Sequence, residues 1–287
     1  MNPRTQAIED TERSGVLTPS NLRRFEAEWV QPSGAACDVV GSYWAVRWQF
    51  PGDEAVAQRI VDFPAITLSI EDGDVPAPFM VTTVRPDAWS RVIRGRGTVF
   101  ALRLKPAGLH VLSDLEPTSL TVEQALTCEL DPRAFEAMRA IAAGHSIAER
   151  ASRADRIIAE MIRERPIGTT HALANAAVDA LTSSARVRSG RAVADRLGIS
   201  ERTLQRALRS TIGLGPNDVA RRIRLQEVVR LLSTPGADTA SIAAELGYVD
   251  QAHLINEFRA VAGTTPGRYL RDLRRSLEGV STTDGGA

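Results

Sequence analysis

Apolar residues recur at helical spacing twice in the last third of the chain, and the two stretches resemble each other. The first copy is AVADRLGISERTLQRALRSTIGLGP from Ala192, and the second is SIAAELGYVDQAHLINEFRAVAGTTP from Ser241. With one inserted residue, Leu204 aligns with Leu254 and Leu208 with Phe258. Each copy predicts a short helix, a turn and a second helix whose polar side chains face outward.

The turns of both copies carry the residues that such a connection requires. Gly198 and Gly247 follow the last apolar position of their helices, where glycine adopts a left-handed backbone at little cost. Ser200 and Asp250 stand at the N-cap, where their oxygens can accept from free amides of the next helix. The pattern predicts two helix-turn-helix units, whose second helix fits the major groove of DNA.

The outward faces of the two second helices hold the candidate DNA-binding residues. They are Arg202, Thr203, Gln205, Arg206 and Arg209 in the first helix, and Gln251, Ala252, Ile255, Asn256 and Arg259 in the second. Arginine can pair with guanine and glutamine or asparagine with adenine, each with roughly 1–3 kcal/mol of discrimination. Ala252 and Ile255 can pack on a thymine methyl group. Either face alone could simply be solvated, but the matched pair favours base recognition.

The segment between the copies predicts one long helix, from Pro216 to Leu232. Proline is well tolerated at the first helical position, and the apolar residues that follow keep helical spacing. Seventeen residues make about 25 Å of helix, and successive major grooves on one face of DNA lie roughly 34 Å apart. The two units could therefore contact adjacent turns of DNA, so that one chain recognises a bipartite site.

The carboxyl-terminal stretch from about Ala172 to Arg274 resembles the DNA-binding domain of the AraC/XylS family of transcription regulators. The resemblance rests on GISERTLQRAL and on IAAELGYVDQAHLINEFRAVAGTTPGRY. It implies that three residues of the first helix and four of the second contact bases or phosphates: Arg202, Gln205, Arg206, Gln251, Ala252, Ile255 and Asn256. Many members carry a polar or basic residue in place of Ile255 and Asn256.

Charge is distributed unevenly along the chain, although 35 basic and 35 acidic residues balance overall. From Arg186 to Arg275 there are 16 arginines, no lysine and 9 acidic residues, a surplus of seven positive charges. The rest of the chain carries the opposite surplus. A basic DNA-binding region beside a domain with another task has this asymmetry.

The amino-terminal portion predicts a mainly-β domain. Strand-like runs cover Val39 to Phe50, Arg59 to Ile70, Phe79 to Val84 and Arg91 to Leu112, the last with a turn at Gly95-Arg96-Gly97. Thr121 to Arg165 has a helical pattern. The phrase YWAVRWQFPG from Tyr43 resembles amino-terminal domains of some AraC-like regulators, in which such a barrel senses a small molecule or mediates dimerisation.

These patterns predict an α+β protein with a small amino-terminal barrel, a helical connector and an all-α carboxyl-terminal domain. The expected divisions are a flexible start (1–20), a β-rich sensor or dimerisation domain (21–115), a helical connector (116–170), an AraC-type DNA-binding domain (171–275, with units at 190–211 and 239–262) and a disordered tail (276–287).

Two questions in the amino-terminal region stay open from sequence. Five aromatic residues could line a ligand pocket or simply form the core: Trp44, Trp48, Phe63, Phe79 and Phe100. Apolar residues of the connector, such as Ile158 and Ile162, could form a dimer interface or pack against the barrel.

The sequence offers little support for catalysis. His110, His145, His171 and His253 lack metal-ligand spacing, and Cys37 and Cys128 are too few for the zinc site and reactive cysteine of an alkyl-DNA repair module. No glycine-rich phosphate loop and no Ser/His/Asp arrangement stands out. We therefore expect no enzyme activity, no catalytic residues, no cofactor and no metal.

The expected function is sequence-specific regulation of transcription, with double-stranded DNA as the partner. Further candidate partners are RNA polymerase, a small-molecule effector and a second copy of the chain. The alternative is a ligand-binding or scaffold protein whose helical units bind another protein. No apolar run approaches the ~20 residues of a membrane span, so we expect a cytoplasmic, nucleoid-associated protein with no membrane partner.

Overall fold

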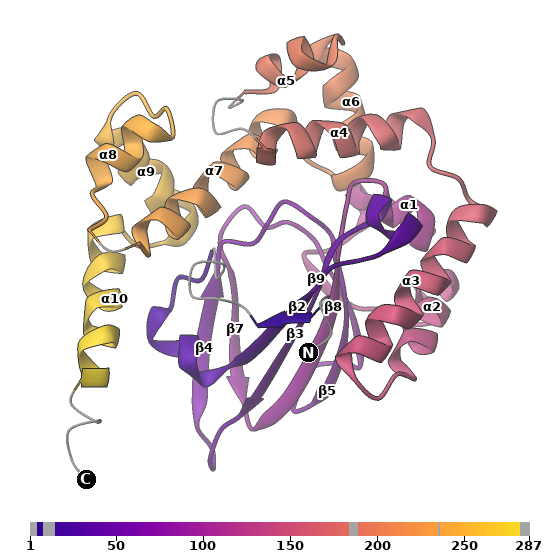
Figure 1. The fold of residues 1–287 in the computed structure, drawn as a ribbon, viewed down its shortest axis with the longest axis horizontal. Helices are drawn as coiled ribbons and strands as arrows, with labels where there is room; N and C mark the ends of the chain where they lie inside the picture. Colours follow the sequence, from indigo (N-terminus) through magenta and orange to yellow (C-terminus); the bar gives the residue numbers. More distant parts are fainter. Residues whose placement is uncertain (1–4, 8–14, 184–188, 235, 282–287) are drawn as a thin grey trace.

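Two antiparallel sheets form the amino-terminal half of the computed structural model, which describes residues 5–7, 15–183, 189–234 and 236–281 (Figure 1). The larger sheet has the strand order β1-β2-β3-β8-β5-β6-β9. Its strands are β1 (Thr5–Ala7), β2 (Glu26–Val30), β3 (Val40–Gln49), β5 (Thr67–Gly73), β6 (Phe79–Thr82), β8 (Arg96–Leu104) and β9 (Glu123–Ala125). The smaller sheet pairs β4 (Ala55–Ile60) with β7 (Trp89–Arg94).

The two faces of the larger sheet have different partners, because successive side chains of a strand point to opposite faces. Tyr43 and Ala45 on β3 belong to a core cluster shared with helices, whereas Trp48 joins a second cluster with Val56 of β4. Gly97 lies opposite Trp48 in the β3–β8 register, and a Cβ there would stand 2.3 Å from the indole ring. The two sheets thus enclose a shared interior and form the predicted barrel.

Three helices cover the outer face of the larger sheet: α1 (Gly108–Leu112), α2 (Pro132–Ala142) and α3 (Ile147–Glu164). Ile158 is fully buried in this cluster and Ile162 packs against it. Asp155 of α3 accepts hydrogen bonds from the Tyr43 hydroxyl, at 2.8 Å, and from Ser33. The apolar residues of the expected connector therefore pack against the barrel.

Several expected elements differ in the structure. The run from Arg59 to Ile70 is divided between β4 and β5, which belong to different sheets, and Pro64 lies between them. The run from Arg91 to Leu112 ends in the short helix α1 instead of a strand. The helical stretch from Thr121 contains β9, which pairs with β6.

The ends of the chain also differ from expectation where they are described. Residues 15–20 are attached to β4, because the amide of Leu17 donates to the Arg59 carbonyl and that of Val61 to Gly15. Residues 5–7 pair with β2 as β1. Residues 276–281 continue a helix, α10. The remaining parts of the expected flexible start and tail, 1–4, 8–14 and 282–287, lie outside the described residues.

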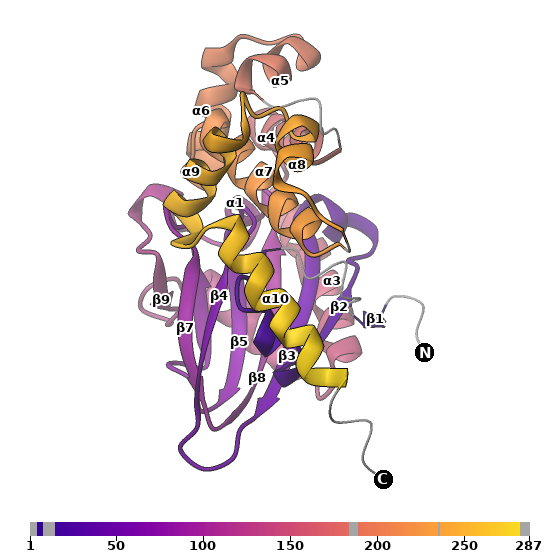
Figure 2. The ribbon, with the colours of Figure 1, turned by 90° about the vertical axis from the view of Figure 1, so that its left-hand side faces the viewer.

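Seven helices make up the carboxyl-terminal region as far as it is described. They are α4 (Thr169–Ser183), α5 (Gly190–Leu197), α6 (Glu201–Ile212), α7 (Pro216–Leu232), α8 (Thr239–Glu245), α9 (Gln251–Ala262) and α10 (Pro266–Ser281). Figure 2 shows α5 to α9 gathered at one end of the sheets, with α10 running down their side. No helix of the described chain is long and apolar enough to cross a membrane.

Helix α7 connects two separate helical cores. Its first half contributes Val219 and Ala220 to a cluster with α4, α5 and α6. Its second half contributes Leu225, Val228, Val229 and Leu232 to a cluster with α8, α9 and α10. The second cluster also includes Leu17, Val61 and Ala88 of the amino-terminal domain, so the second helical unit is packed directly onto the barrel.

Candidate nucleic-acid interface

The first helix-turn-helix unit consists of α5 and α6. Gly198 ends α5 in the left-handed conformation, with φ of 65°. Ser200 then caps α6, since its hydroxyl accepts from the Thr203 amide at 3.1 Å. Leu204, Ala207 and Leu208 are buried. These contacts fix the orientation of α6 relative to α5, as the sequence predicts.

The opposite face of α6 is open. Arg202, Gln205, Arg206 and Arg209 are exposed, whereas Thr203 is half-buried and shares a hydrogen bond with Ser200. Within the described part of the chain, none of the three arginines has an ion pair or side-chain hydrogen bond. Three flexible positive charges therefore extend into solvent from one helix.

The second unit, α8 and α9, repeats this geometry with other side chains. Gly247 has a φ of 66°, and Asp250 caps α9 by accepting from the His253 amide at 2.7 Å. Leu254 and Phe258 are fully buried. Of the candidate DNA-binding residues, four are exposed and one, Ile255, is half-buried; the exposed ones are Gln251, Ala252, Asn256 and Arg259.

A polar network that sequence reasoning missed joins α9 to α7. Glu257 accepts from the Tyr248 hydroxyl at 2.9 Å and lies 3.7 Å from both Arg221 and Arg224. Arg224 also stacks over the Tyr248 ring at 4.8 Å. Burial, reinforced by the charge of Glu257, raises the pKa of Tyr248. The inward position of Glu257 holds α9 on α7 and removes a negative charge from its outer face.

Helix α7 separates the two units as the sequence predicts, from Pro216 to Leu232 with Gly215 at the N-cap. Its 17 residues give an axial length of about 25 Å. The carboxyl-terminal helices contact the amino-terminal domain at several points: Gly213 lies near Pro117, the Val261 carbonyl accepts from the Ala88 amide at 2.9 Å, and Asn175 of α4 accepts from the Ala107 amide and donates to the Asp38 carbonyl. Helix α10 packs on residues 19–24. The residues at the start of α6 and α9, among them Arg202 and Gln251, are exposed in the described structure.

An ion pair buried between the two halves of the molecule centres on Arg222 of α7. Its guanidinium contacts the Asp62 carboxylate and donates to the carbonyls of Arg85 and Asp87, each at 2.8 Å. Gln226, one turn later, donates to the Val61 carbonyl at 2.9 Å. Burial raises the pKa of Asp62 to about 6, although Arg222 opposes the rise. We call these contacts the interdomain contact.

A cavity of about 290 Å³ lies between the two sheets, next to the interdomain contact. Trp44, Trp48 and Phe63 line it, whereas Phe79 packs on Phe135 and Phe100 stacks on Tyr43 in the core under the helices. Of the five expected aromatic residues, three therefore line the cavity and two belong to the core under the helices. Sequence analysis missed three lining aromatics, Phe25, Trp29 and Trp89, because the strand faces were not yet paired. Asp62 and Gln226 of the interdomain contact also line the cavity.

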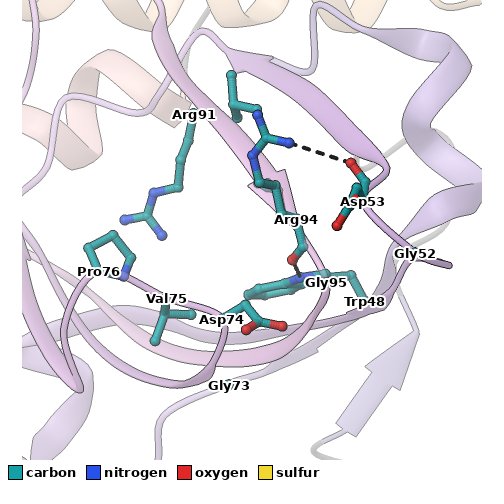
Figure 3. A pocket seen from close by; sticks show the side chains of 12 residues that line it. Trp48, Gly52, Asp53, Gly73, Asp74, Val75, Pro76, Arg91, Arg94 and Gly95 are labelled. Atoms are coloured by element: carbon teal, nitrogen blue, oxygen red, sulfur yellow. Dashed lines mark hydrogen bonds between the residues drawn. The ribbon is translucent and has the colours of Figure 1, made fainter.

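A second, more open hollow of about 640 Å³ adjoins this cavity, and Trp48, Arg91 and Ile93 line both. Figure 3 shows Trp48 at its base, where the indole N–H donates to the Arg94 carbonyl at 2.9 Å. Arg94 extends toward Asp53 and contacts its carbonyl at 3.5 Å. The side chains of Trp48, Arg91 and Ile93 therefore lie at the boundary between the two hollows.

The histidines and cysteines form no metal site in the part of the chain that the structure describes. His110 and His171 stack with ring centroids 4.0 Å apart, and burial lowers the pKa of both. Cys37 and Cys128 are free and exposed. His253 lies on α9, where its ring packs edge-on against Tyr248.

Two helix-turn-helix units joined by one helix are typical of DNA-binding domains. Comparison with known proteins shows which kind of helix-turn-helix domain this is. Residues 193–272 match the family model described as a helix-turn-helix domain. Over 93 residues, 32% of this chain and 26% of the relative, the chain is 39% identical to the transcriptional regulator VirS of Mycobacterium tuberculosis. Over 88 residues, 31% of this chain and 30% of the relative, it is 35% identical to the transcriptional activator RhaS of Escherichia coli. The carboxyl-terminal domain is therefore a helix-turn-helix domain of the AraC type.

These alignments span less than a third of either relative's length. Among solved structures, the chain is similar to ToxT from Vibrio cholerae, with a TM-score of 0.45 and 9% identity over 80% of this chain and 98% of that one.

Proposed function

We propose that the protein is a sequence-specific DNA-binding transcription regulator that recognises a bipartite site with both recognition helices. The observation that carries this proposal is the pair of exposed polar faces, on α6 and α9, held apart by the single helix α7. Arg202, Thr203, Gln205, Arg206 and Arg209 contact the first half-site. Gln251, Ala252, Ile255, Asn256 and Arg259 contact the second. Residues 171–275 form the DNA-binding domain.

We also propose that a small molecule, bound in the amino-terminal domain, controls binding of the protein to DNA. The cavity between the sheets is bounded by Gln226 of α7 and by Phe63, which also packs against the core of the first helix-turn-helix unit. A ligand in this cavity therefore contacts the central helix through Gln226. It also contacts Phe63, whose ring packs against the first unit. The same ligand would contact Asp62 of the interdomain contact. Residues 21–115 act as the sensor domain, and RNA polymerase and a second copy of the chain are partners to be tested.

The decisive experiment removes the charges of the first face from the full-length protein. The triple variant Arg202→Ala, Arg206→Ala, Arg209→Ala is expected to lose promoter binding while keeping its fold. The dependence of log affinity on log salt should become shallower by about 0.9 for each phosphate contact removed. Footprinting on genomic fragments, with circular dichroism as the check on folding, measures both.

A matched control removes three exposed arginines from helices on the barrel, by Arg139→Ala, Arg156→Ala and Arg163→Ala. The loss of net charge is the same, but DNA affinity should change little. Equal loss in both triple variants means that the effect is general electrostatics. Unchanged affinity in the first triple variant would instead favour a scaffold that binds protein.

A further inference from the structure

We infer that the second helix-turn-helix unit recognises an A·T-rich half-site, and that three apolar side chains on its outer face contact thymine methyl groups there. The three are Val249, Ala252 and Ile255, and we call them the apolar stripe. This inference rests on the proposed function. It adds the base composition of the second half-site and one residue, Val249, that is not among the candidate DNA-binding residues.

The turn before α9 is one residue longer than the turn before α6, and the extra residue is Val249. Both turns begin in the same way, because the amide of Ile199 or Tyr248, directly after the glycine, donates to a carbonyl of the preceding helix at 3.0 or 2.9 Å. In the first unit the N-cap, Ser200, follows at once. In the second, Val249 stands between Tyr248 and the N-cap, Asp250.

The side chain of Val249 faces solvent, although the residue before it is buried. Tyr248 occupies the apolar position of the turn and is 6% exposed, whereas Val249 is 87% exposed. The other large apolar side chains with high exposure in the described chain are Val92, at 57%, and Leu130, at 38%. Removing apolar surface from water is favourable, and a β-branched side chain has few rotamers to lose. A partner that covers Val249 therefore gains affinity from it.

Val249 lies at the end of the unit that enters the major groove in helix-turn-helix complexes, where the first residues of the second helix contact base edges. It directly precedes the N-cap of α9, and Ala252 follows as the second helical residue. Ile255 lies on the same face as Ala252, because residues three apart are neighbours on a helix. The apolar stripe therefore runs from the start of α9 along the face proposed to contact bases.

The chemistry of this face favours A·T pairs. The thymine methyl group is apolar and projects into the major groove, where apolar side chains can contact it. Gln251 and Asn256, both exposed on α9, carry amides that can form two hydrogen bonds with adenine. Arg259 is the one arginine among the candidate residues of α9, whereas α6 has three, and arginine favours guanine. We therefore expect the two half-sites to differ in base composition.

The first experiment selects sequences from random double-stranded DNA with the full-length protein. The selected sequences should contain two blocks with strong base preferences. The block that the second unit contacts is the one whose preferences change in the variant Gln251→Ala. We expect A·T pairs at most positions of this second block and guanine in the other.

The second experiment replaces thymine by deoxyuridine, which pairs with adenine in the same way but lacks the methyl group. Each single replacement at a thymine that the apolar stripe contacts should weaken binding of the wild type roughly fourfold, the effect of burying about one methyl group. In Val249→Ser, one of these thymines should lose its sensitivity to the replacement, since the side chain that covers its methyl group is gone. Val249→Ile should retain the sensitivity. Fluorescence anisotropy measures each affinity.

The matched control is Val92→Ser, which changes an exposed valine of β7 on the barrel. It should distinguish thymine from deoxyuridine as the wild type does. Val249→Ser should unfold at the same temperature as the wild type, because the side chain that it removes is exposed. A change in its DNA binding is then not a folding defect.

Equal affinity of the wild type for thymine and deoxyuridine at every position overturns the inference, as does a second block without preference for A·T pairs. It is also overturned if Val249→Ser keeps the sensitivity of the wild type at every thymine. Should that variant bind DNA normally but fail to regulate transcription, Val249 contacts a protein instead. If the wild type selects a DNA sequence and fails these tests, the proposed regulator stands without this contact; if it selects none, the proposed function fails as well.

Discussion

The two helix-turn-helix units share one turn geometry but differ in their surroundings and their charge. The first packs on α4 and carries three arginines on its open face that have no ion pair within the described residues. The second has one arginine, Arg259, on that face, and its core includes Leu17, Val61 and Ala88 of the barrel. We infer that the first unit supplies most of the electrostatic affinity for DNA. The second unit shares its buried core with Leu17, Val61 and Ala88 of the amino-terminal domain, whereas the first contacts that domain through the partly buried Phe63.

This difference follows from what surrounds α7. At its first half the buried side chains are apolar and face helices of the first unit. From Arg222 onward the same helix faces the barrel and uses Arg222, Arg224 and Gln226 for polar contacts with the barrel or with α9. Hence α7 joins the units to each other and the second unit to the barrel.

The largest effect is expected from breaking the core of the second unit. Phe258→Ala should lower the free energy of unfolding by about 3–5 kcal/mol, since it removes a fully buried ring. The amides of Val61 and Ala88 should then exchange faster with deuterium, because Phe258 lies in the cluster that holds the barrel.

Leu204→Ala provides the matched change in the first unit. It should cost about 2–5 kcal/mol but leave the exchange of Val61 and Ala88 nearly unchanged. Equal acceleration in both variants would contradict the asymmetry between the units.

Next in size is the loss of the interdomain contact. Arg222→Met leaves Asp62 without its partner, and removing one member of a buried pair costs about 3–5 kcal/mol. The double variant Asp62→Asn, Arg222→Met should recover much of this loss. Thermal unfolding, together with exchange at Ala88, measures the effect. If the double variant is no more stable than the single one, the pair is not the source of the coupling.

The same pair gives a pH dependence with a defined sign. Burial raises the pKa of Asp62 from 3.8 to about 6, so the folded protein binds this proton more tightly than the unfolded chain. Stability from this group is therefore full below pH 4 and falls as pH rises toward 6. The free energy of unfolding of the wild type and of Asp62→Asn, measured between pH 4 and pH 6, isolates the effect of this group. If the wild type gained stability relative to Asp62→Asn as the pH rises, the pKa of Asp62 would be lowered by folding instead of raised.

Sequence patterns predicted the carboxyl-terminal helices better than the barrel for a physical reason. Helix α7 and the caps Ser200 and Asp250 depend on residues a few positions apart, which the sequence shows directly. The partners of strands lie far along the chain, so the division between β4 and β5 was not visible. Helix α1, with five residues, is too short to show a period.

In the candidate site, too, only the features that depend on residues close together in the sequence could be predicted. Exposure of the recognition faces follows from helical period, because buried Leu204 and Leu254 fix which sides point outward. Helical spacing assigns Arg222 no particular role, since its partner Asp62 is 160 positions away. The position of Arg103 between the rings of Trp29 and Phe63 likewise depends on which strands surround it, and no local pattern reports that.

A smaller effect should distinguish what the two recognition faces contribute to DNA affinity and to its salt dependence. Arg206→Ala is expected to weaken binding by roughly 1–3 kcal/mol and to reduce the salt slope by about 0.9 if the side chain contacts phosphate. Asn256→Ala should weaken binding without changing the slope, because it removes no charge. Fluorescence anisotropy at several salt concentrations measures both. Equal slopes in the two variants would mean that the first unit holds no special electrostatic role.

The smallest predicted effect concerns the caps of the two recognition helices. Ser200→Ala and Asp250→Ala each remove an acceptor for a free amide, of Thr203 and His253 respectively, at a cost of about 1 kcal/mol. The loss at Ser200 should appear mainly as fraying of α6, since little else holds its start. At Asp250 the effect on α9 should be smaller, because Glu257 still ties the helix to Tyr248 and Arg224. Hydrogen exchange of the first-turn amides compares the two directly, and a larger loss in α9 would show that the polar network does not support the helix start.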